Sequence, residues 1–332
     1  MATETVQNPV EALDAALARA DAAAARGDQE GAIGILVDEI PGKFASDGLA
    51  FIRSAEQLGR LNRWDEAEDV LRRGVEAVAT NQRLARSYAL RARSRGDHTV
   101  ALGRFAVLRE RFPDFAVGHA DYIEALIILG QADAAEAAAS EAVEAFPGDR
   151  WVANAHARAA EARGDAAAAL ARWQAIRSAW PDHPLGLPGE LRALCRLGRY
   201  AEASDLLTSA NDPQLWGEAA GLAGLAGGWP FAAAWWERFR AARPDDEKGY
   251  ARGGLALLRS GDAAAAQRLL DHARVRWPGS DALAALQAEL NAREDAAPPR
   301  AELVSALVEE TPPPAAEKKA PSKRGAFGWL GW

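Results

Sequence analysis

Apolar residues recur at helical spacing along the chain, in two blocks within each stretch of 34 or so residues. The clearest stretch is 116–149. Its first half places apolar residues on one helical face, at Val117, Ala120, Ile123, Leu126 and Ile127. Its second half repeats the pattern with alanines, at Ala135, Ala139 and Ala142. The stretch therefore predicts two helices, joined at Leu129-Gly130 and ended by Phe146-Pro147. Asp133 is the expected N-cap of the second helix.

The same turn recurs eight times. A glycine or asparagine stands at Gly27, Asn62, Gly96, Gly130, Gly164, Gly198, Gly228 and Gly261, with successive spacings of 35, 34, 34, 34, 34, 30 and 33 residues. Five positions later stands an alanine, at Ala32, Ala67, Ala101, Ala135, Ala169, Ala203, Ala233 and Ala266. The seventh turn is ambiguous by one residue, and Gly227 is preferred, because it places Ala232 and Trp236 at the expected offsets. A fixed period of this length predicts a stack of similar supersecondary units.

Two further positions complete the repeat. Nine residues after each turn an apolar residue is expected to face the partner helix, at Leu36, Leu71, Phe105, Ala139, Trp173, Leu207, Trp236 and Leu270. Aromatic-proline pairs end the second helix at Phe112-Pro113, Phe146-Pro147, Trp180-Pro181 and Trp277-Pro278. Since proline disfavours helix in the residue before it, these pairs act as stops.

This pattern resembles the tetratricopeptide repeat (TPR) family, whose motif combines the turn glycine, the early alanine, the large mid-helix residue and the final proline. The resemblance covers residues 10–280 and is most specific in repeats three, four, five and eight. Repeats one and two lack the final proline at its expected place, and repeats six and seven are irregular in spacing. The family's glycine-tyrosine pair in the first helix is mostly missing, which is typical of a divergent member.

The resemblance implies an all-α fold, a right-handed superhelical solenoid of about eight helix-turn-helix repeats spanning residues 1–294. Residues 280–294 are expected to form a closing helix, whose polar outer face carries Gln287, Glu289 and Arg293. Residues 295–332 are expected to form a disordered, proline-rich tail, since TPPPAAEKKAPSKR is too polar to bury a core.

Composition and charge restrict the classes of function and the cellular location that are expected for the chain. The formal net charge is −8, which argues against a nucleic-acid binder with a basic surface. The start of the chain lacks the basic and apolar regions of a secretory signal, and no apolar stretch reaches the length of a membrane span. The expected location is cytoplasmic or membrane-peripheral. The abundance of alanine and arginine, with little lysine, is typical of a GC-rich bacterial genome.

The first candidate site is the inner face of the superhelix, where ligands of the family generally lie along the first helix of each pair. The resemblance places nine polar residues there: Arg83, Arg86, Arg93, Asn154, Arg158, Arg192, Arg196, Lys248 and Arg259. Guanidinium groups pair well with carboxylates, so an acidic peptide or chain terminus is the expected ligand. The alternative is that these arginines are ordinary solvated residues on exposed helix faces.

The second candidate site is the aromatic end of the tail, at Phe327, Trp329, Leu330 and Trp332. Clustered aromatic residues usually mark an interaction site. Three uses remain open. The segment is a motif that inserts into a partner's pocket, a cap that folds back on the solenoid, or a weak membrane-surface contact assisted by Lys318, Lys319, Lys323 and Arg324.

A tryptophan-rich stretch in repeat seven offers a third candidate. It contains Trp216, Trp229, Phe231, Trp235, Trp236 and Phe239. We interpret these residues as packing that fills the space left by GLAGLAGG rather than as a recognition patch. Because Trp235 and Trp236 are consecutive, one of the two is expected to be exposed.

No catalytic or cofactor-binding set is present. The five histidines are scattered and lack metal-ligand spacing, and Cys195 is the single cysteine. The sequence therefore predicts a non-enzymatic scaffold without cofactors, whose partners are proteins or peptides and not nucleic acid. The alternative is an accessory subunit of a larger enzyme or envelope complex, in glycan synthesis or secretion, whose tail contacts the membrane. A free-standing enzyme is disfavoured, since the repeats leave too little chain for a catalytic domain.

Overall fold

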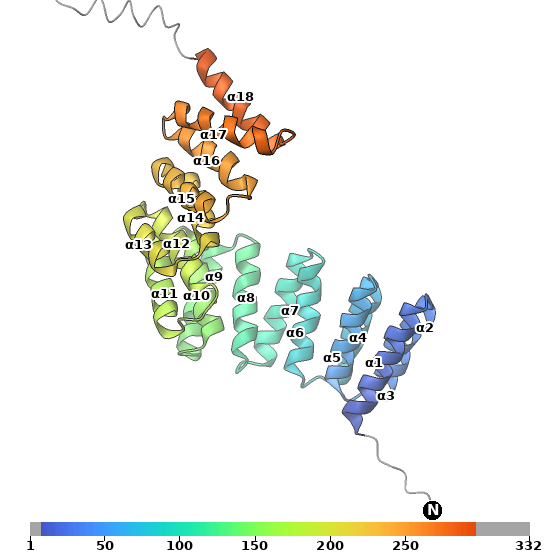
Figure 1. Cartoon of the computed structure of the whole chain (residues 1–332). Helices are drawn as coiled ribbons and strands as arrows, with labels where there is room; N and C mark the ends of the chain where they lie inside the picture. Colours follow the sequence, from blue (N-terminus) through green and yellow to red (C-terminus); the bar gives the residue numbers. More distant parts are fainter. Residues whose placement is uncertain (1–7, 297–332) are drawn as a thin grey trace, which may run out of the picture. The chain divides into compact units, whose positions relative to one another are not determined.

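Residues 8–296 of the computed structural model are described here, and they form antiparallel helix pairs with no strand among them (Figure 1). The chain divides into two compact units within helix α15, between Trp235 and Trp236. The first unit contains six complete helix pairs, α14 and the first half of α15, and the second contains the rest of α15, one pair and a closing helix. The predicted all-α repeat array is confirmed.

The helices of the first unit follow in order. The first pair is α1 (Pro9–Ala25) with one continuous helix made of α2 (Gln29–Gly34), the π-helical turn η1 (Ile35–Glu39) and α3 (Ile40–Lys43). The next pairs are α4 (Gly48–Arg60) with α5 (Trp64–Ala77), α6 (Gln82–Ser94) with α7 (His98–Arg111), and α8 (Ala116–Ile128) with α9 (Ala132–Ala145). Then come α10 (Arg150–Arg163) with α11 (Ala166–Ala179), α12 (Gly186–Arg196) with α13 (Tyr200–Ala210), and α14 (Pro213–Leu225) with α15 (Trp229–Ala242).

The turn between the two helices of each pair has the left-handed backbone that the sequence predicts. Asn62 has a φ of 59°, and seven glycines have positive φ angles at the expected positions: Gly27, Gly96, Gly130, Gly164, Gly198, Gly227 and Gly261. Glycine adopts this conformation without the steric cost that a side chain brings. The ambiguous seventh turn is at Gly227, whose φ is 82°, as preferred from the sequence.

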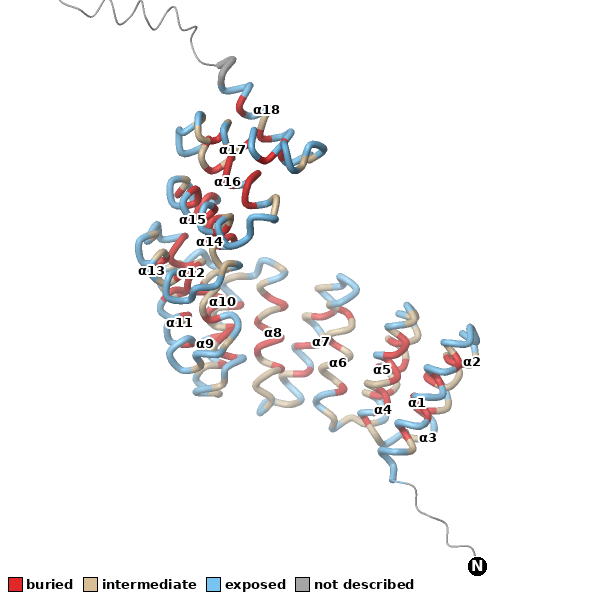
Figure 2. Tube along the Cα trace, viewed as in Figure 1, coloured by how far each residue is buried: buried red, intermediate tan, exposed pale blue. Residues whose placement is uncertain are grey.

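The two apolar positions that follow each turn form the core between helices (Figure 2). The alanine five residues after the turn is buried in every repeat, including Ala232 in the seventh, and Ala67, Ala135 and Ala169 have no exposed surface. The residue nine positions after the turn is also buried throughout, from Leu36 to Leu270. Alanine at the first position lets the two helices of a pair approach closely, and the larger residue fills the space one turn later.

The N-cap prediction for α9 is wrong. Helix α9 begins at Ala132, its N-cap residue is Gln131, and no side chain caps it. Asp133 instead lies in the first turn, where Arg163 Nε donates a hydrogen bond of 3.1 Å to its carboxylate. The aspartates that cap second helices stand directly after the turn glycine, as Asp165 and Asp262 do. Repeat four has glutamine at that place, and the carboxylate two residues later is too far into the helix.

The second unit contains the end of α15, the pair α16 (Glu247–Arg259) and α17 (Ala263–Arg276), and the closing helix α18 (Asp281–Ala296). Leu258, Leu270, Leu283, Leu286 and Leu290 share one core cluster, so α18 covers the apolar side of the last pair. The closing helix was expected over 280–294, and it has this position. Within residues 8–296, no helix combines the length and the apolar character that crossing a membrane requires.

Consecutive Trp235 and Trp236 are both buried, with 2% and 5% of their surface exposed, so the expectation that one is exposed is wrong. Trp235 Nε1 donates a hydrogen bond to Ser204 Oγ (2.9 Å) in the first unit. Trp236 packs edge-on against Phe239 in the second unit, with 5.3 Å between ring centroids. The two rings leave the helix in different directions, and each direction meets packed side chains. Their burial agrees with a packing role.

Candidate functional site

Seven of the nine predicted inner-face residues lie on the first helices of the third, fifth and sixth pairs, in the first unit. Helix α6 carries Arg83, Arg86 and Arg93, α10 carries Asn154 and Arg158, and α12 carries Arg192 and Arg196. The helix between them, α8, contributes acidic residues instead. The other two predicted residues, Lys248 and Arg259, belong to α16 in the second unit.

Four of these arginines form ion pairs between neighbouring first helices. Arg86 Nε donates a hydrogen bond to Asp121 on α8, and Arg93 Nη1 lies 3.9 Å from the same carboxylate. Arg158 Nη1 lies 2.7 Å from Glu124 Oε2, and Arg192 Nε donates a 3.2 Å hydrogen bond to Glu161 Oε1. We call this set of residues the arginine ladder: Arg86, Arg93, Arg158 and Arg192 with Asp121, Glu124 and Glu161. It links α6, α8, α10 and α12.

The carboxylates of the arginine ladder lie deeper than the guanidinium groups. Asp121, Glu124 and Glu161 expose 10–16% of their side chains, whereas the four arginines expose 29–39%. Burial raises the pKa of Glu124, against the opposing fields of Arg158 and Arg93. The surface that a partner would meet is therefore formed mainly by guanidinium groups, with their carboxylates beneath them.

Glu161 holds several groups in place at once. Besides Arg192, its carboxylate accepts a 2.8 Å hydrogen bond from the indole Nε1 of Trp173, whose side chain is completely buried. Arg196 Nη1 donates to the main-chain carbonyl of the same residue (3.1 Å). Asn154, also on α10, is 8% exposed, and its Oδ1 atom has no hydrogen-bond partner among the described residues.

The remaining predicted residues differ in their surroundings. Arg83 and Lys248 are exposed, and no ion pair joins either of them to another residue in the range 8–296. Arg259 pairs with Glu289 of the closing helix at 2.7 Å. Phe327, Trp329, Leu330 and Trp332 lie outside the described residues.

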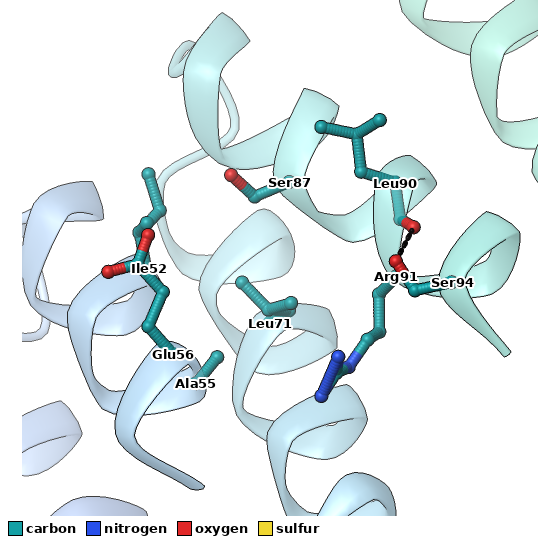
Figure 3. A pocket seen from close by; sticks show the side chains of 8 residues that line it. All are labelled: Ile52, Ala55, Glu56, Leu71, Ser87, Leu90, Arg91 and Ser94. Carbon is teal, nitrogen blue, oxygen red and sulfur yellow. Dashed lines mark hydrogen bonds between the residues drawn. The ribbon is translucent and has the colours of Figure 1, made fainter. Parts of the chain in front are cut away.

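Two pockets open on the first-helix side of the first unit. One, which we call the α4–α6 pocket, has a volume of 170 Å³ and is lined by Ile52, Ala55, Glu56, Leu71, Ser87, Leu90, Arg91 and Ser94 (Figure 3). The other has a volume of 330 Å³ and lies between α12 and α14, where Pro188, Leu191, Arg192, Glu218, Leu222 and Leu225 contribute to its walls. The arginine ladder runs from α6, which lines the first pocket, to α12, which lines the second, and Arg192 belongs to both the ladder and the second pocket.

Sequence reasoning missed the acidic partners of the arginines. Asp121 follows Arg86 by 35 residues, Arg158 follows Glu124 by 34, and Arg192 follows Glu161 by 31. These separations equal about one repeat, so opposite charges one period apart were the available signal. A search for opposite charges at this separation would have predicted that three of the arginines form ion pairs with the neighbouring repeat.

No group of three histidine, cysteine, aspartate or glutamate side chains within 8–296 is arranged to hold a metal ion. Cys195 is buried in α12, and burial raises the pKa of its thiol to about 11, so the reactive thiolate is scarce at neutral pH.

Comparison with known proteins defines the fold class. No protein-family model matches the chain, and no curated protein matches it in sequence. A solved tetratricopeptide repeat protein from Parabacteroides merdae superposes with a TM-score of 0.51 at 14% identity, over 74% of this chain and 99% of that one. The C-terminal part of a TPR repeat-containing protein from Cytophaga hutchinsonii gives a TM-score of 0.49 at 14% identity, over 71% and 98%.

The chain is a helical-repeat protein built from paired antiparallel helices. Its turn residues, buried alanines and structural likeness give it the tetratricopeptide repeat fold, as the sequence resemblance predicts.

Proposed function

We propose that this protein is a non-enzymatic scaffold, located in the cytoplasm or at the membrane periphery, that binds an acidic segment of a partner protein along the arginine ladder. One observation carries the proposal: in the arginine ladder, on α6, α8, α10 and α12, the guanidinium groups are more exposed than the carboxylates with which they pair. A partner carboxylate would meet arginine N–H groups first.

The balance of charge supports this ligand. Six arginines stand on these helices at the predicted positions, at Arg83, Arg86, Arg93, Arg158, Arg192 and Arg196, against the three carboxylates of the ladder. This excess of positive charge lies within a chain whose formal net charge is −8. Arginine presents several N–H donors in a planar fork, so each one can keep its internal carboxylate and still donate to a second.

The test is the binding of a fluorescently labelled peptide of alternating Glu and Leu residues, measured by anisotropy, with a Gln–Leu peptide as the neutral control. The triple variant Arg86→Gln, Arg158→Gln, Arg192→Gln should weaken binding of the acidic peptide about 10-fold, which corresponds to ~1.4 kcal/mol. Added salt should weaken wild-type binding as well, because exposed charges are screened.

A matched control is Arg72→Gln. Arg72 is exposed on the second helix α5 and pairs with Asp69 and Glu76 of its own helix, so its loss should leave peptide binding unchanged. Equal affinity of the triple variant and the wild type for the acidic peptide would contradict the proposal. Binding of the Gln–Leu peptide with the same affinity as the Glu–Leu peptide would contradict it too, since the protein would then not distinguish a charged ligand from a neutral one.

We also propose that the aromatic segment Phe327, Trp329, Leu330 and Trp332 recruits a second partner, which would raise the effective concentration of the first. Its composition supports this: aromatic anchors follow the basic residues Lys318, Lys319, Lys323 and Arg324. The test compares the full chain with a version ending at Thr311 in affinity capture and in co-sedimentation with anionic vesicles. Loss of a captured protein on truncation supports recruitment, and loss of vesicle binding alone favours the accessory-subunit alternative.

A further inference from the structure

Arg91 on helix α6 occupies a packing position that other repeats give to alanine. It stands five residues before its turn glycine, and the same place holds Ala125, Ala159, Ala193 and Ala256 in the fourth, fifth, sixth and eighth repeats. Those four alanines are at most 2% exposed. The third repeat therefore places a long cationic side chain where the fold normally needs a methyl group.

The Arg91 guanidinium lacks the acceptors that such a group normally has. Its Nε and Nη2 atoms are buried, and neither has a hydrogen-bond partner among the described residues. Buried polar groups are nearly always paired, and an unpaired charge is costly to bury. Two neighbouring arginines are satisfied: Arg63 pairs with Glu66, and Arg95 pairs with Asp65 at 2.6 Å.

Two features of the protein accommodate the Arg91 charge in part. Its guanidinium carbon lies 4.4 Å from the centroid of the Trp64 ring, which favours the cation through the ring's quadrupole. The field of Glu68 also favours the charged form, but Glu68 forms its ion pair with Arg104. No carboxylate within residues 8–296 forms an ion pair with Arg91.

Space for the stack is provided by Gly59. A Cβ atom at Gly59 would lie 3.0 Å from Trp64 Cζ3 and 3.3 Å from Arg91 Nη2, so a larger residue would push against both partners of the stack. Three positions from two repeats thus agree in holding the guanidinium where it lies, although the stack leaves two of its nitrogen atoms without an acceptor.

Arg91 lines two adjoining cavities. One is the α4–α6 pocket, where the Arg91 guanidinium lies at one end and the Glu56 carboxylate extends to the other, beside Ile52 (Figure 3). The second is a 560 Å³ cavity at the helix turn, lined by Arg91 together with Asn62, Arg63, Trp64, Asp65, Glu66, Ser94 and Arg95. The floor and walls of the α4–α6 pocket include the apolar side chains of Ile52, Ala55, Leu71 and Leu90.

We call Arg91, with Trp64 and Gly59 beside it, the Arg91 junction, since Arg91 lines both cavities. We propose that this junction binds a peptide carboxylate that lies next to an apolar side chain. The carboxylate would contact Arg91, and the apolar side chain would enter the α4–α6 pocket. A single unneutralised guanidinium matches a single negative charge. A phosphate dianion fits less well, because the carboxylates of Glu56, Asp65 and Glu66 line the same two cavities. The carboxylate can come from a chain terminus or from an acidic side chain.

The test uses the full chain, labelled with ¹⁵N, and short probes followed by NMR at the Arg91 Nε and Trp64 indole signals. N-acetyl-leucine offers a terminal carboxylate, N-acetyl-Leu-Glu-amide offers a side-chain carboxylate, and N-acetyl-Leu-Gln-amide is the uncharged control. At least one carboxylate probe should shift both signals saturably, and the one that does identifies the source. The control should shift neither.

The substitution Arg91→Ala should raise the dissociation constant of that probe at least ~10-fold and leave the melting temperature unchanged or higher, since it restores the residue found in other repeats. Arg91→Met keeps a long side chain stacked on Trp64 but lacks the charge, and it should weaken probe binding as much as Arg91→Ala does. Arg95→Ala removes an arginine that is paired with Asp65, and it should leave probe binding unchanged. The triple ladder variant retains Arg91 and should bind the probe as the wild type does. Failure of this proposal can therefore be distinguished from failure of the proposed ladder function.

Three results would overturn the proposal. The first is saturable binding of neither carboxylate probe. The second is retention of probe binding in Arg91→Met. The third is equal or tighter binding of inorganic phosphate at the same two signals, which would assign the site to another class of anion.

Discussion

The arginine ladder and the Arg91 junction use the same residue type on the same row of helices, yet their energetics differ. In the ladder each arginine has a carboxylate one repeat away, and the charge is neutralised inside the protein. At the junction an arginine stands where other repeats have a buried alanine, and two nitrogen atoms of its guanidinium group lack acceptors. The difference shows that the offset from the turn, not the residue type, decides whether an arginine has an internal carboxylate partner.

The offset acts through geometry. Positions six and ten residues before the turn, where Arg158 and Arg86 stand, lie on the side that first helices share with their neighbours. The position five residues before the turn is directed into the contact between pairs, where Ala125 and Ala159 are buried. A charge at that position is tolerated in the third repeat because Trp64 and Gly59 are present beside it.

The largest expected effect comes from placing the same arginine where these two residues are missing. Ala159 on α10 is completely buried, and Ala132 holds the position that corresponds to Trp64. Ala159→Arg should destabilise the protein by about 3–5 kcal/mol, because it adds overpacking to an unpaired buried charge. Chemical denaturation followed by circular dichroism measures the change in the free energy of unfolding.

The control is Ala159→Met, which adds a long side chain without a charge and should cost about 1–3 kcal/mol. Equal losses for the two variants would mean that volume alone matters at this position. The argument that Arg91 needs its special surroundings would then fail.

The repeat register could be predicted from the sequence because each of its positions has a local physical reason. A backbone position with a positive φ angle favours glycine, so the turns at Gly130 and Gly164 can be predicted from the sequence alone. A close helix contact favours alanine, which fixes Ala135 and Ala169. The period then extends the assignment to the irregular seventh turn at Gly227.

The Arg91 junction was not predicted, because its members come from two repeats and from different offsets. A signal was nevertheless present. Trp64 follows Gly59 by five residues, and Trp229 follows Gly224 by five. In both cases a Cβ on the glycine would press on the tryptophan ring, at 3.0 Å and 2.8 Å. Glycine before the turn and tryptophan after it therefore form a matched pair, in which the absence of a side chain on the glycine makes room for the tryptophan ring.

An intermediate effect is expected at the part of the ladder that is joined to the core. Glu161→Ala removes the acceptor of the buried Trp173 indole N–H as well as the partner of Arg192. Leaving a buried donor unpaired should cost about 2 kcal/mol in the free energy of unfolding. Glu161→Gln retains an acceptor oxygen and should lose less than half as much. Asp121→Ala should also cost less, because Arg86 and Arg93 are partly exposed and can be solvated. A larger loss for Asp121→Ala than for Glu161→Ala would contradict this order.

The smallest effect separates two carboxylates with equal exposure. Glu124 in the ladder and Glu136 on α9 each expose 16% of the side chain. Burial raises the pKa of Glu124, whereas the hydrogen bonds from Arg172 lower the pKa of Glu136. In the folded protein Glu124 keeps its proton at a pH where an unfolded chain has lost it, so its contribution to stability falls as the pH rises through the raised pKa. Glu136 contributes stability above the ordinary glutamate pKa and loses it as the pH falls through the lowered pKa.

Side-chain ¹³C chemical shifts followed against pH should therefore give Glu124 a higher titration midpoint than Glu136. Arg158→Met should raise the Glu124 midpoint further, and Arg172→Met should raise that of Glu136. Coincident midpoints in the wild type would show that the ladder carboxylate is as well stabilised as the one on the second helix, and the contrast between the two would disappear.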